Sequence, residues 1–232
     1  MKVAAFVPVK LNNERAPGKN VRPFGDGTPL ITHFLRTLVQ VPEIDELYVY
    51  CSREEIRAYL IPGVTYLKRP QFLDTQEATP QDIIRCFMSQ VEADVYMVCH
   101  CTSPFVKAER FSECIQKVCG GGYDSAFTGE KLQRLLWHDG RPLNFDAANV
   151  PRTQDLPVYY NEVSAAYVFH RRTFETLNRR VGVNPYICQV SGVECVDIDY
   201  PEDFEIANAI YMTILKKEEE HEPSTTAGLY AP

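Results

Sequence analysis

Residues 3–20 read VAAFVPVKLNNERAPGKN, an apolar run that passes directly into a loop rich in lysine, asparagine and glycine. The run at 3–9 is apolar throughout, as a strand buried on both faces of a parallel sheet must be. The loop that follows carries Lys10, Arg15 and Lys19. Ligands of open α/β sheets bind at the carboxyl ends of strands, so the loop predicts a binding site.

The rest of the chain continues this alternation of apolar, β-rich runs with segments of helical period. We predict strands at 3–9, 46–52, 64–67, 94–100, 123–130, 163–169, 185–190 and 194–199, and helices at 29–41, 53–60, 79–91, 107–119, 171–177 and 201–217. The alternation predicts a three-layer α/β fold in which helices cover a mostly parallel sheet.

The pattern is interrupted between residues 131 and 160. RLLWHDGRPLNF reads as a β-hairpin that turns at Asp139-Gly140, and a polar stretch with prolines follows it. We interpret 131–160 as an excursion from a single domain of residues 1–216. Residues 217–232 are charged, then small and polar, and predict a flexible tail.

Composition restricts the classes of function. The chain has 232 residues, 45% of them hydrophobic, enough for one large core, and its net charge of -7 argues against nucleic acid or an anionic membrane as partner. No signal-peptide pattern follows Met1, and no apolar stretch reaches the roughly 18 residues that a bilayer requires. None of the eight cysteines forms a CxxC pair. We therefore expect a cytoplasmic protein with reduced thiols.

The basic loop is suited to a phosphate chain, because glycine allows close backbone approach to an anion and lysine supplies positive charge. The alternative is a solvated loop whose lysines contact nothing. Neither GxxxxGK[ST] nor GxGxxG follows the first strand, which disfavours a P-loop kinase and a nicotinamide enzyme.

A second candidate is the acidic pair in Asp197-Ile198-Asp199. Alternation along a strand would send both carboxylates to one face about 7 Å apart, where they can share a hydrated Mg²⁺ ion. The alternatives are a polar strand end and an N-cap role for Asp199. Phosphoryl transfer needs cations and metal-binding carboxylates in one place, so the loop and the pair support each other.

Five segments, in order, resemble the acylneuraminate cytidylyltransferases, a family that includes enzymes for CMP-sialic acid, CMP-KDO and the CMP derivatives of legionaminic and pseudaminic acids. They are PVKLNNERAPGKN at 8–20, YLKRPQFLDTQEAT at 66–79, HCTSPF at 100–105, TQDLPVYYNEVSAAYVF at 153–169 and VDIDYPEDFEIA at 196–207. The resemblance implies the fold of nucleotide-diphospho-sugar transferases. It also implies transfer of CMP from CTP to the anomeric hydroxyl of an acidic 2-keto-3-deoxy sugar, a nonulosonic or octulosonic acid, with release of pyrophosphate.

The resemblance also implies roles for single residues on the nucleotide side. Lys19 and Asn20 match the residues that hold CTP, and Lys10 takes the place of an arginine that faces the reacting phosphate. Arg69 matches an arginine near cytosine and ribose, and Ala78 matches backbone that reads the base.

The metal and catalytic roles follow in the same way. Asp197 and Asp199 match carboxylates that bind Mg²⁺, the cofactor that the family uses. Lys10, Lys19 and Asp199 are therefore the expected catalytic residues. Lys10 and Mg²⁺ would stabilise charge on the α-phosphate, while Lys19 would hold the departing phosphates.

Two departures from the family lie in the basic loop. Lys10 keeps a positive charge but lacks the two-pronged grip of arginine. Asn13-Glu14-Arg15 replaces Ser-Lys-Gly, so Arg15 is a candidate to bind the phosphates of CTP directly.

Other departures lie on the acceptor side. His100 stands where a sugar-contacting glutamine is common in the family. Together with Gln133, Arg152 and Tyr160 it makes up our set of acceptor-binding candidates. Arg152 is the candidate for the acceptor carboxylate, and Tyr160 is a candidate for stacking.

The excursion at 131–160 matches a dimerisation element of the family whose residues also cover the sugar site of the partner subunit. A homodimer that binds CTP and an acidic sugar is thereby implied. Two other functions stay open. One is a cytidylyltransferase with a phosphate or phosphonate acceptor, suggested by Arg15, and the other is a nucleotide-binding partner protein without catalysis.

Overall fold

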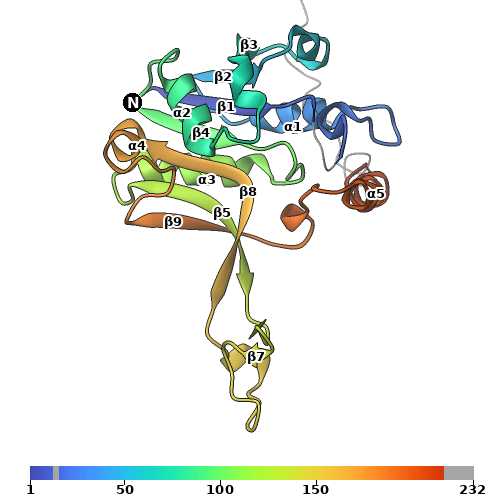
Figure 1. Ribbon diagram of the computed structural model, residues 1–232, viewed down its shortest axis with the longest axis vertical. Helices are drawn as coiled ribbons and strands as arrows, with labels where there is room; N and C mark the ends of the chain where they lie inside the picture. The colour runs from blue at the N-terminus through green and yellow to red at the C-terminus, as the bar shows by residue number, and fades with distance from the viewer. Residues whose placement is uncertain (13–15, 217–232) are drawn as a thin grey trace, which may run out of the picture.

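The computed structural model describes residues 1–12 and 16–216, with a seven-stranded sheet at the centre (Figure 1). Its strands are β1 (Val3–Val9), β2 (Glu46–Cys51), β3 (Val64–Lys68), β4 (Val95–Cys99), β5 (Ser125–Leu132), β8 (Tyr159–His170) and β9 (Pro185–Val190). The order is β3-β2-β1-β4-β8-β5-β9, and β8 alone is antiparallel to its neighbours. The predicted mostly parallel sheet is confirmed.

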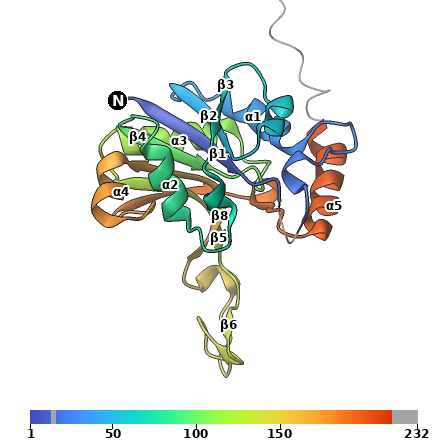
Figure 2. The same ribbon diagram turned by 45° about the horizontal axis from the view of Figure 1, so that its top comes forward.

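Helices cover both faces of the sheet (Figure 2). They are α1 (Leu30–Leu38), α2 (Pro80–Met88), α3 (Ala108–Cys119), α4 (Arg171–Leu177) and α5 (Pro201–Ile210), which continues as a π-helical turn at Tyr211–Leu215. Apolar side chains of α1 and α3 pack on one face, and those of α2 and α4 on the other. Because β1 has Val7 on one face and Phe6 on the other, both fully buried, this strand is apolar throughout.

The strand order reverses beside β1. The chain runs outward from β1 to β2 and β3, and then returns to place β4 on the other side of β1. The carboxyl ends of β1 and β4 therefore lie at the topological switch point, where open α/β sheets form the crevice that binds their ligands.

The segment predicted as a strand at 194–199 is not one. It forms a 3-10 turn at Gly192–Cys195 and then crosses the carboxyl edge of the sheet. Ile198 is fully buried in a small cluster under α5 that includes Phe24, Phe105 and Phe204. Burial in this cluster explains the apolar pattern that we interpreted as a strand. The helix predicted at 53–60 is likewise a 3-10 helix, Glu54–Tyr59.

The excursion predicted at 131–160 is an arm. Strands β5 and β8 leave the sheet together, paired as far as Leu132 and Tyr159, and the arm projects away from the body (Figure 1). Beyond them, β6 (Trp137–His138) and β7 (Arg141–Pro142) form a hairpin whose turn residues both have positive φ. A type I′ turn requires that conformation, which explains the Asp-Gly pair.

The expected tail, 217–232, lies outside the described residues. In the part of the chain that is described, no helix is both long and apolar enough to cross a membrane.

Candidate active site

Three of the predicted site residues occupy equivalent places in the fold. Lys10, Arg69 and His100 each follow directly on the last residue of a parallel strand, β1, β3 and β4 respectively. They consequently lie along one edge of the sheet, with β1 and β4 at the switch point. This shared edge is where we expected the ligand.

Asn20 fastens the loop after β1 to the loop after β4. Its side chain is buried, and Nδ2 donates to the carbonyl oxygen of Lys10 at 2.9 Å. Its Oδ1 accepts from Sγ of Cys101 at 3.5 Å. Gly18, at φ 70°, opens the turn that places Lys19 and Asn20. Asn20 therefore sets the shape of the crevice, whereas its contact with CTP stays a prediction.

Lys19 crosses the crevice to the acidic pair. The residue is 8% exposed, and its Nζ lies 2.5 Å from the carbonyl oxygen of Ile198 and 3.4 Å from Oδ1 of Asp199. The basic loop and the Asp197-Ile198-Asp199 segment, far apart in sequence, thus meet at one point. The structure brings together the two groups that we predicted to act on one polyphosphate.

The acidic segment is held mainly through its backbone. The amide of Ile198 donates to the carbonyl oxygen of Thr102 at 2.8 Å, and Ser103 Oγ donates to Oδ1 of Asp197 at 3.4 Å. The N-cap role considered for Asp199 is wrong, because Tyr200 occupies the N-cap of α5.

A carboxylate in the first turn of α5, that of Asp203, also holds the backbone of the acidic segment. Asp203 accepts the backbone N–H groups of Asp199 and Tyr200 at 2.9 and 2.7 Å. A carboxylate there also interacts favourably with the helix N-terminus.

The electrostatics of this segment fit a cation. Desolvation by the surrounding protein raises the pKa of Asp197, and the charge of Asp199 raises it further, against hydrogen bonds from Thr102 and Ser103 and the charge of Lys19. A bound cation would relieve the repulsion between the two carboxylates. Within residues 1–12 and 16–216, no three histidine, cysteine or acidic side chains cluster as a metal site. Two carboxylates with phosphate and water oxygens are a set that Mg²⁺ accepts.

Arg69 is fixed at the ends of β2 and β3. It is 3% exposed, its guanidinium pairs with Asp74, and the other carboxylate oxygen of Asp74 accepts from Ser52 Oγ at 2.5 Å. Its Nε is buried and has no hydrogen-bond partner among the described residues. Ala78 lies half-buried in the loop before α2. Arg15 lies outside the described residues.

His100, which we predicted to bind the acceptor, lies at the end of β4 in a corner of the site that it shares with Tyr167, Glu162 and Arg180. Its ring meets the edge of Tyr167 at 6.3 Å between centroids, and its buried Nε2 lacks a partner in the described part of the chain. Burial lowers the pKa of His100 to about 4, with the charges of Arg180 and then Lys19 adding to the effect. The imidazole is therefore neutral at pH 7.

Three residues at this corner, Glu162, Tyr167 and Arg180, were not among the site residues that the sequence predicted. Tyr167 is buried, donates from its hydroxyl to Oε2 of Glu162 at 2.8 Å, and carries the Arg180 guanidinium 3.5 Å above its ring. Tyr167 lies inside a segment that we quoted, and Arg180 belongs to a basic pair directly after α4. Until the fold is known, neither the quoted segment nor the basic pair indicates a binding site.

The other acceptor-binding candidates lie on the arm. Gln133 Nε2 donates to the backbone carbonyls of Gln154 and Leu156 at 3.2 and 3.1 Å, so this side chain braces the arm. Arg152 pairs with Asp155 at 2.8 Å, and Tyr160 is 44% exposed at the base of the arm. The arm itself extends away from the body of the chain (Figure 1).

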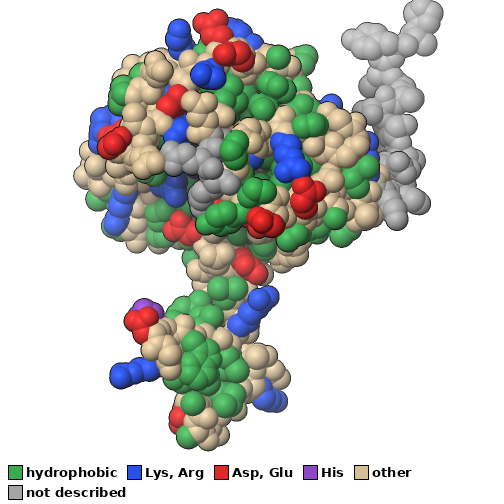
Figure 3. Space-filling model, turned by 45° about the vertical axis from the view of Figure 1, so that its right-hand side comes forward, with side chains coloured by type: hydrophobic (Ala, Val, Ile, Leu, Met, Phe, Trp, Pro, Cys, Tyr) green, Lys and Arg blue, Asp and Glu red, His purple; other side chains and the backbone are tan. Residues whose placement is uncertain are grey.

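Hydrophobic side chains gather on the arm, as Figure 3 shows. Its exposed apolar residues are Leu135, Trp137, Leu143, Val150, Val158, Tyr159 and Tyr160. Trp137, 59% exposed, also meets Phe145 edge-on. An exposed apolar surface of this kind commonly marks an interaction site.

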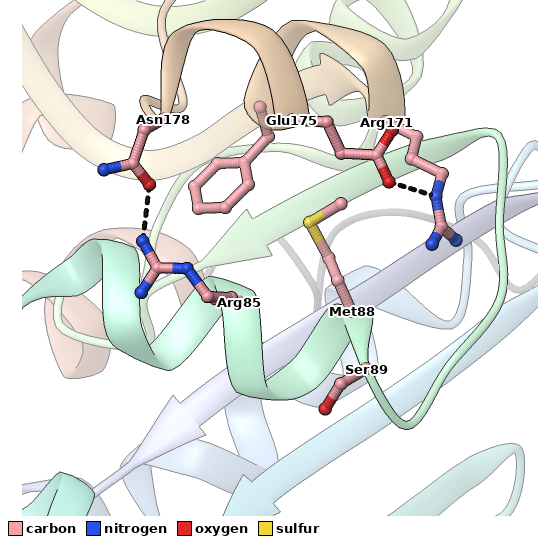
Figure 4. A pocket seen from close by; sticks show the side chains of 7 residues that line it. Arg85, Met88, Ser89, Arg171, Glu175 and Asn178 are labelled. Atoms are coloured by element: carbon pink, nitrogen blue, oxygen red, sulfur yellow. Dashed lines mark hydrogen bonds and ion pairs between the residues drawn. The ribbon is translucent and has the colours of Figure 1, made fainter.

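Two cavities flank α2. One, of about 330 Å³, lies between α2 and α4, and its arginines are already paired, Arg85 with Asn178 at 2.6 Å and Arg171 with Glu175 at 2.8 Å (Figure 4). None of the predicted site residues lines it. The other, of about 310 Å³, lies by the first turn of α2 and is lined by Pro80, Gln81, Ile84, Glu162, Arg179, Arg180, Val181 and Gly182.

Curated proteins similar in sequence to this chain are cytidylyltransferases. The N-acylneuraminate cytidylyltransferase A of Danio rerio is 25% identical over 215 residues, which are 88% of this chain and 50% of that protein. The enzyme of the same name from Streptococcus agalactiae serotype V is 22% identical, over 88% of this chain and 52% of its own. The chain thus spans about half the length of these curated relatives.

Solved structures share the fold. The CMP:2-keto-3-deoxy-manno-octonic acid synthetase complexed with CTP superposes with a TM-score of 0.69 at 16% identity, over 94% of this chain and all of that one. The 4-diphosphocytidyl-2C-methyl-D-erythritol synthase of Anaerococcus prevotii gives 0.63 at 15% identity, over 91% and 96%. The family model described as cytidylyltransferase matches residues 4–222, and the chain belongs to that family.

Proposed function

We propose that this chain transfers CMP from CTP to an acidic sugar of the 2-keto-3-deoxy class and releases pyrophosphate. One observation carries the proposal: Lys19 of the basic loop contacts the Asp197-Ile198-Asp199 segment at the switch point of the sheet. Cationic and acidic groups in one crevice are what transfer from a nucleoside triphosphate requires.

The reaction is a displacement at the α-phosphorus of CTP. The acceptor oxygen forms a new bond to phosphorus, the bond to the bridging oxygen of the β-phosphate breaks so that pyrophosphate leaves, and the hydroxyl proton passes to water. Lys10 would stabilise charge on the α-phosphate, and Lys19 would face the departing phosphates. The buried Lys19 is held before substrate arrives, so little reorganisation is needed.

Asp197 and Asp199 would hold Mg²⁺. The bound ion would neutralise charge on the phosphates. Lys19 keeps Asp199 in place at 3.4 Å, and Ser103 contacts Asp197, so both carboxylates have supporting groups in the protein. The charge of Asp199 opposes ionisation of Asp197, and a bound cation would relieve this repulsion, which supports the assignment.

A homodimer is the second part of the proposal. The arm exposes Trp137, Leu143 and Val150 at 59%, 54% and 55%, a surface that a second copy could bury. The candidates Arg152 and Tyr160 lie on the arm, and in such a dimer they would reach the acceptor site of the partner.

Turnover tests the proposal. The protein is incubated with CTP, Mg²⁺ and, separately, N-acetylneuraminate, 2-keto-3-deoxy-manno-octonic acid and a sugar phosphate, and pyrophosphate release is measured. We expect release with a sugar acid, none when UTP replaces CTP, and its loss in Asp199→Asn but not in the matched variant Glu202→Gln. Pyrophosphate release with the sugar phosphate alone would show that the acceptor is a phosphate and not a sugar acid. No release with any acceptor would favour a nucleotide-binding protein without catalysis.

A further inference from the structure

Arg180, for which the described residues provide no ion pair, lines the cavity at the first turn of α2. The Arg180 guanidinium rests 3.5 Å above the Tyr167 ring, and the described residues offer it no ion pair or hydrogen bond. Its neighbour differs, because Arg179 Nη2 donates to the carbonyl oxygen of Gly182 at 3.2 Å. Of the two arginines that line this cavity of about 310 Å³, Arg180 is the one whose donors are available.

The loop that carries Arg180 is tightly fixed. Asp124 accepts the backbone N–H groups of Val183 and Asn184 at 2.7 and 3.0 Å, and Gly182 donates to Ser125 Oγ at 2.8 Å. A Cβ at Gly182 would come within 2.2 Å of the Asp124 carboxylate, so a larger residue would displace the group that holds the loop. Arg180 is thus presented from a rigid loop, which lowers the entropic cost of binding a ligand.

The groups around Arg180 suit a polyhydroxylated ligand. Glu162 accepts from the Tyr167 hydroxyl through Oε2 and lines the same cavity, so it can accept hydroxyl groups of a sugar. The buried Nε2 of His100 has no hydrogen-bond partner among residues 1–12 and 16–216, and a ligand would supply one. The His100 ring meets the Tyr167 ring that carries Arg180, and the next residue, Cys101, bonds to Asn20 of the loop after β1, so His100 lies where the two regions adjoin.

We propose that Arg180 binds the oxyanion of the acceptor and selects acidic acceptors, while Glu162 and His100 bind its hydroxyl groups. The inference rests on the proposed function and names the acceptor chemistry of that site. A guanidinium held over an aromatic ring presents its planar fork of donors, which matches a carboxylate in two-pronged fashion. Because the carboxylate of a 2-keto acid is bonded to the anomeric carbon, an acceptor bound in this way would hold its reacting hydroxyl close to Arg180, and transfer requires that hydroxyl to face the α-phosphate of CTP.

Equilibrium binding tests this assignment without turnover. The probes are N-acetylneuraminate, its methyl ester and ribitol 5-phosphate, titrated calorimetrically with CMP present into the wild-type protein, Arg180→Gln, Arg180→Lys and Arg172→Gln. Arg172 is an exposed arginine of α4 outside the cavity and is the matched control. Thermal melting of each variant verifies that it folds.

We expect Arg180→Gln to weaken binding of the acid about 10- to 100-fold, the range of a charge-assisted hydrogen bond, and Arg180→Lys to lose less. Arg172→Gln should bind like the wild type, and the ester should bind weakly to all. Arg180-dependent binding of the sugar phosphate instead would support the same oxyanion site with phosphate as its source.

Equal affinity of the wild type and both Arg180 variants, equal binding of ester and acid, or no binding of either oxyanion at millimolar concentration would overturn the inference. Pyrophosphate release, measured on the same protein variants in a separate assay with CTP, Mg²⁺ and the acid, separates this inference from the proposed function. Release that is indifferent to Arg180 leaves the function standing and removes the inference. Binding of the acid that depends on Arg180, in a wild-type protein that releases no pyrophosphate, supports the inference and removes the proposed function.

Discussion

Nζ of Lys19 lies 3.4 Å from Oδ1 of Asp199, a contact between residues 180 positions apart in sequence. Its second bond, to the carbonyl oxygen of Ile198, fixes the lysine on the backbone between the two acidic residues. One side chain therefore connects the loop after β1 with the acidic segment. Its removal should affect the geometry of Asp197 and Asp199, the pair that we propose to hold Mg²⁺, as well as the charge that we propose to face the phosphates.

Lys19→Met is the direct test of this contact. We expect kcat/KM for CTP to fall about 100-fold or more, because a preorganised positive charge is lost from the site of transfer. Lys19→Arg should recover only part of the activity, since a planar guanidinium does not fit the buried space of an ammonium group. Steady-state pyrophosphate release provides the measurement. Lys117→Met, on α3, serves as control, and activity within about twofold of wild type in Lys19→Met would contradict the assignment.

The start of α5 provides a second prediction. Asp203 accepts the backbone N–H groups of Asp199 and Tyr200, so Asp203→Ala should cost about 1 kcal/mol of stability, as loss of a helix-capping carboxylate does. It should also raise the Mg²⁺ concentration needed for half-maximal activity, because Asp199 loses a backbone anchor. Chemical denaturation and a Mg²⁺ titration measure the two effects.

Glu202→Ala is the matched control for that pair of measurements. Glu202 is exposed in the same first turn of α5. An identical Mg²⁺ requirement in Asp203→Ala and Glu202→Ala would show that Asp203 only stabilises the helix.

The ion pair of Arg69 with Asp74 provides a third prediction. Arg69 is 3% exposed, and in Asp74→Asn its charge would stay buried without a partner. We expect the free energy of unfolding to fall by about 3 kcal/mol, the size found when one member of a buried pair is removed. Urea unfolding measures this, with exposed Glu77→Gln as control.

The same variant reports on the nucleotide. If Arg69 contacts CTP as proposed, saturating CTP should restore more stability to Asp74→Asn than to the wild type, since the phosphates or the base edge would supply the missing partner. Equal stabilisation of both proteins by CTP would place Arg69 outside the nucleotide site.

The sequence predicted the residues whose place follows from strand order. Lys10 and His100 each follow an apolar run, and the ends of parallel strands meet at one edge whatever the connecting segments do. Arg180 could not be found in this way. Its position depends on where the loop after α4 returns across the face of the sheet, a tertiary relationship that local pattern does not encode.

The segment at 194–199 shows the opposite failure. Its alternation of apolar and acidic residues is that of a strand, but Ile198 is buried by α5 and its amide bonds to Thr102, not to a neighbouring strand. A single buried side chain between two polar ones produces the same pattern as a β-strand. The acidic pair was thus identified for a partly wrong structural reason.

Acid sensitivity provides the last prediction, through His33. Its ring lies among Phe24, Phe105 and Tyr211 with centroids 5.8, 5.8 and 5.0 Å away. Burial, and then the charge of Arg36, lower the pKa of His33 to about 4 from 6.5, against a hydrogen bond to the Pro104 carbonyl.

Because folding lowers the pKa of His33, acid destabilises the folded protein. Between pH 6.5 and 4 the unfolded chain binds a proton at His33 that the folded chain does not, so stability is complete above pH 6.5 and is lost as the pH falls toward 4. The loss amounts to at most about 3 kcal/mol. His33→Phe keeps the aromatic contacts and should flatten this part of the stability curve, whereas His138→Gln, on the exposed hairpin of the arm, should not. Urea unfolding from pH 4 to 7.5 measures both, and parallel curves for wild type and His33→Phe would show that His33 does not cause the acid sensitivity.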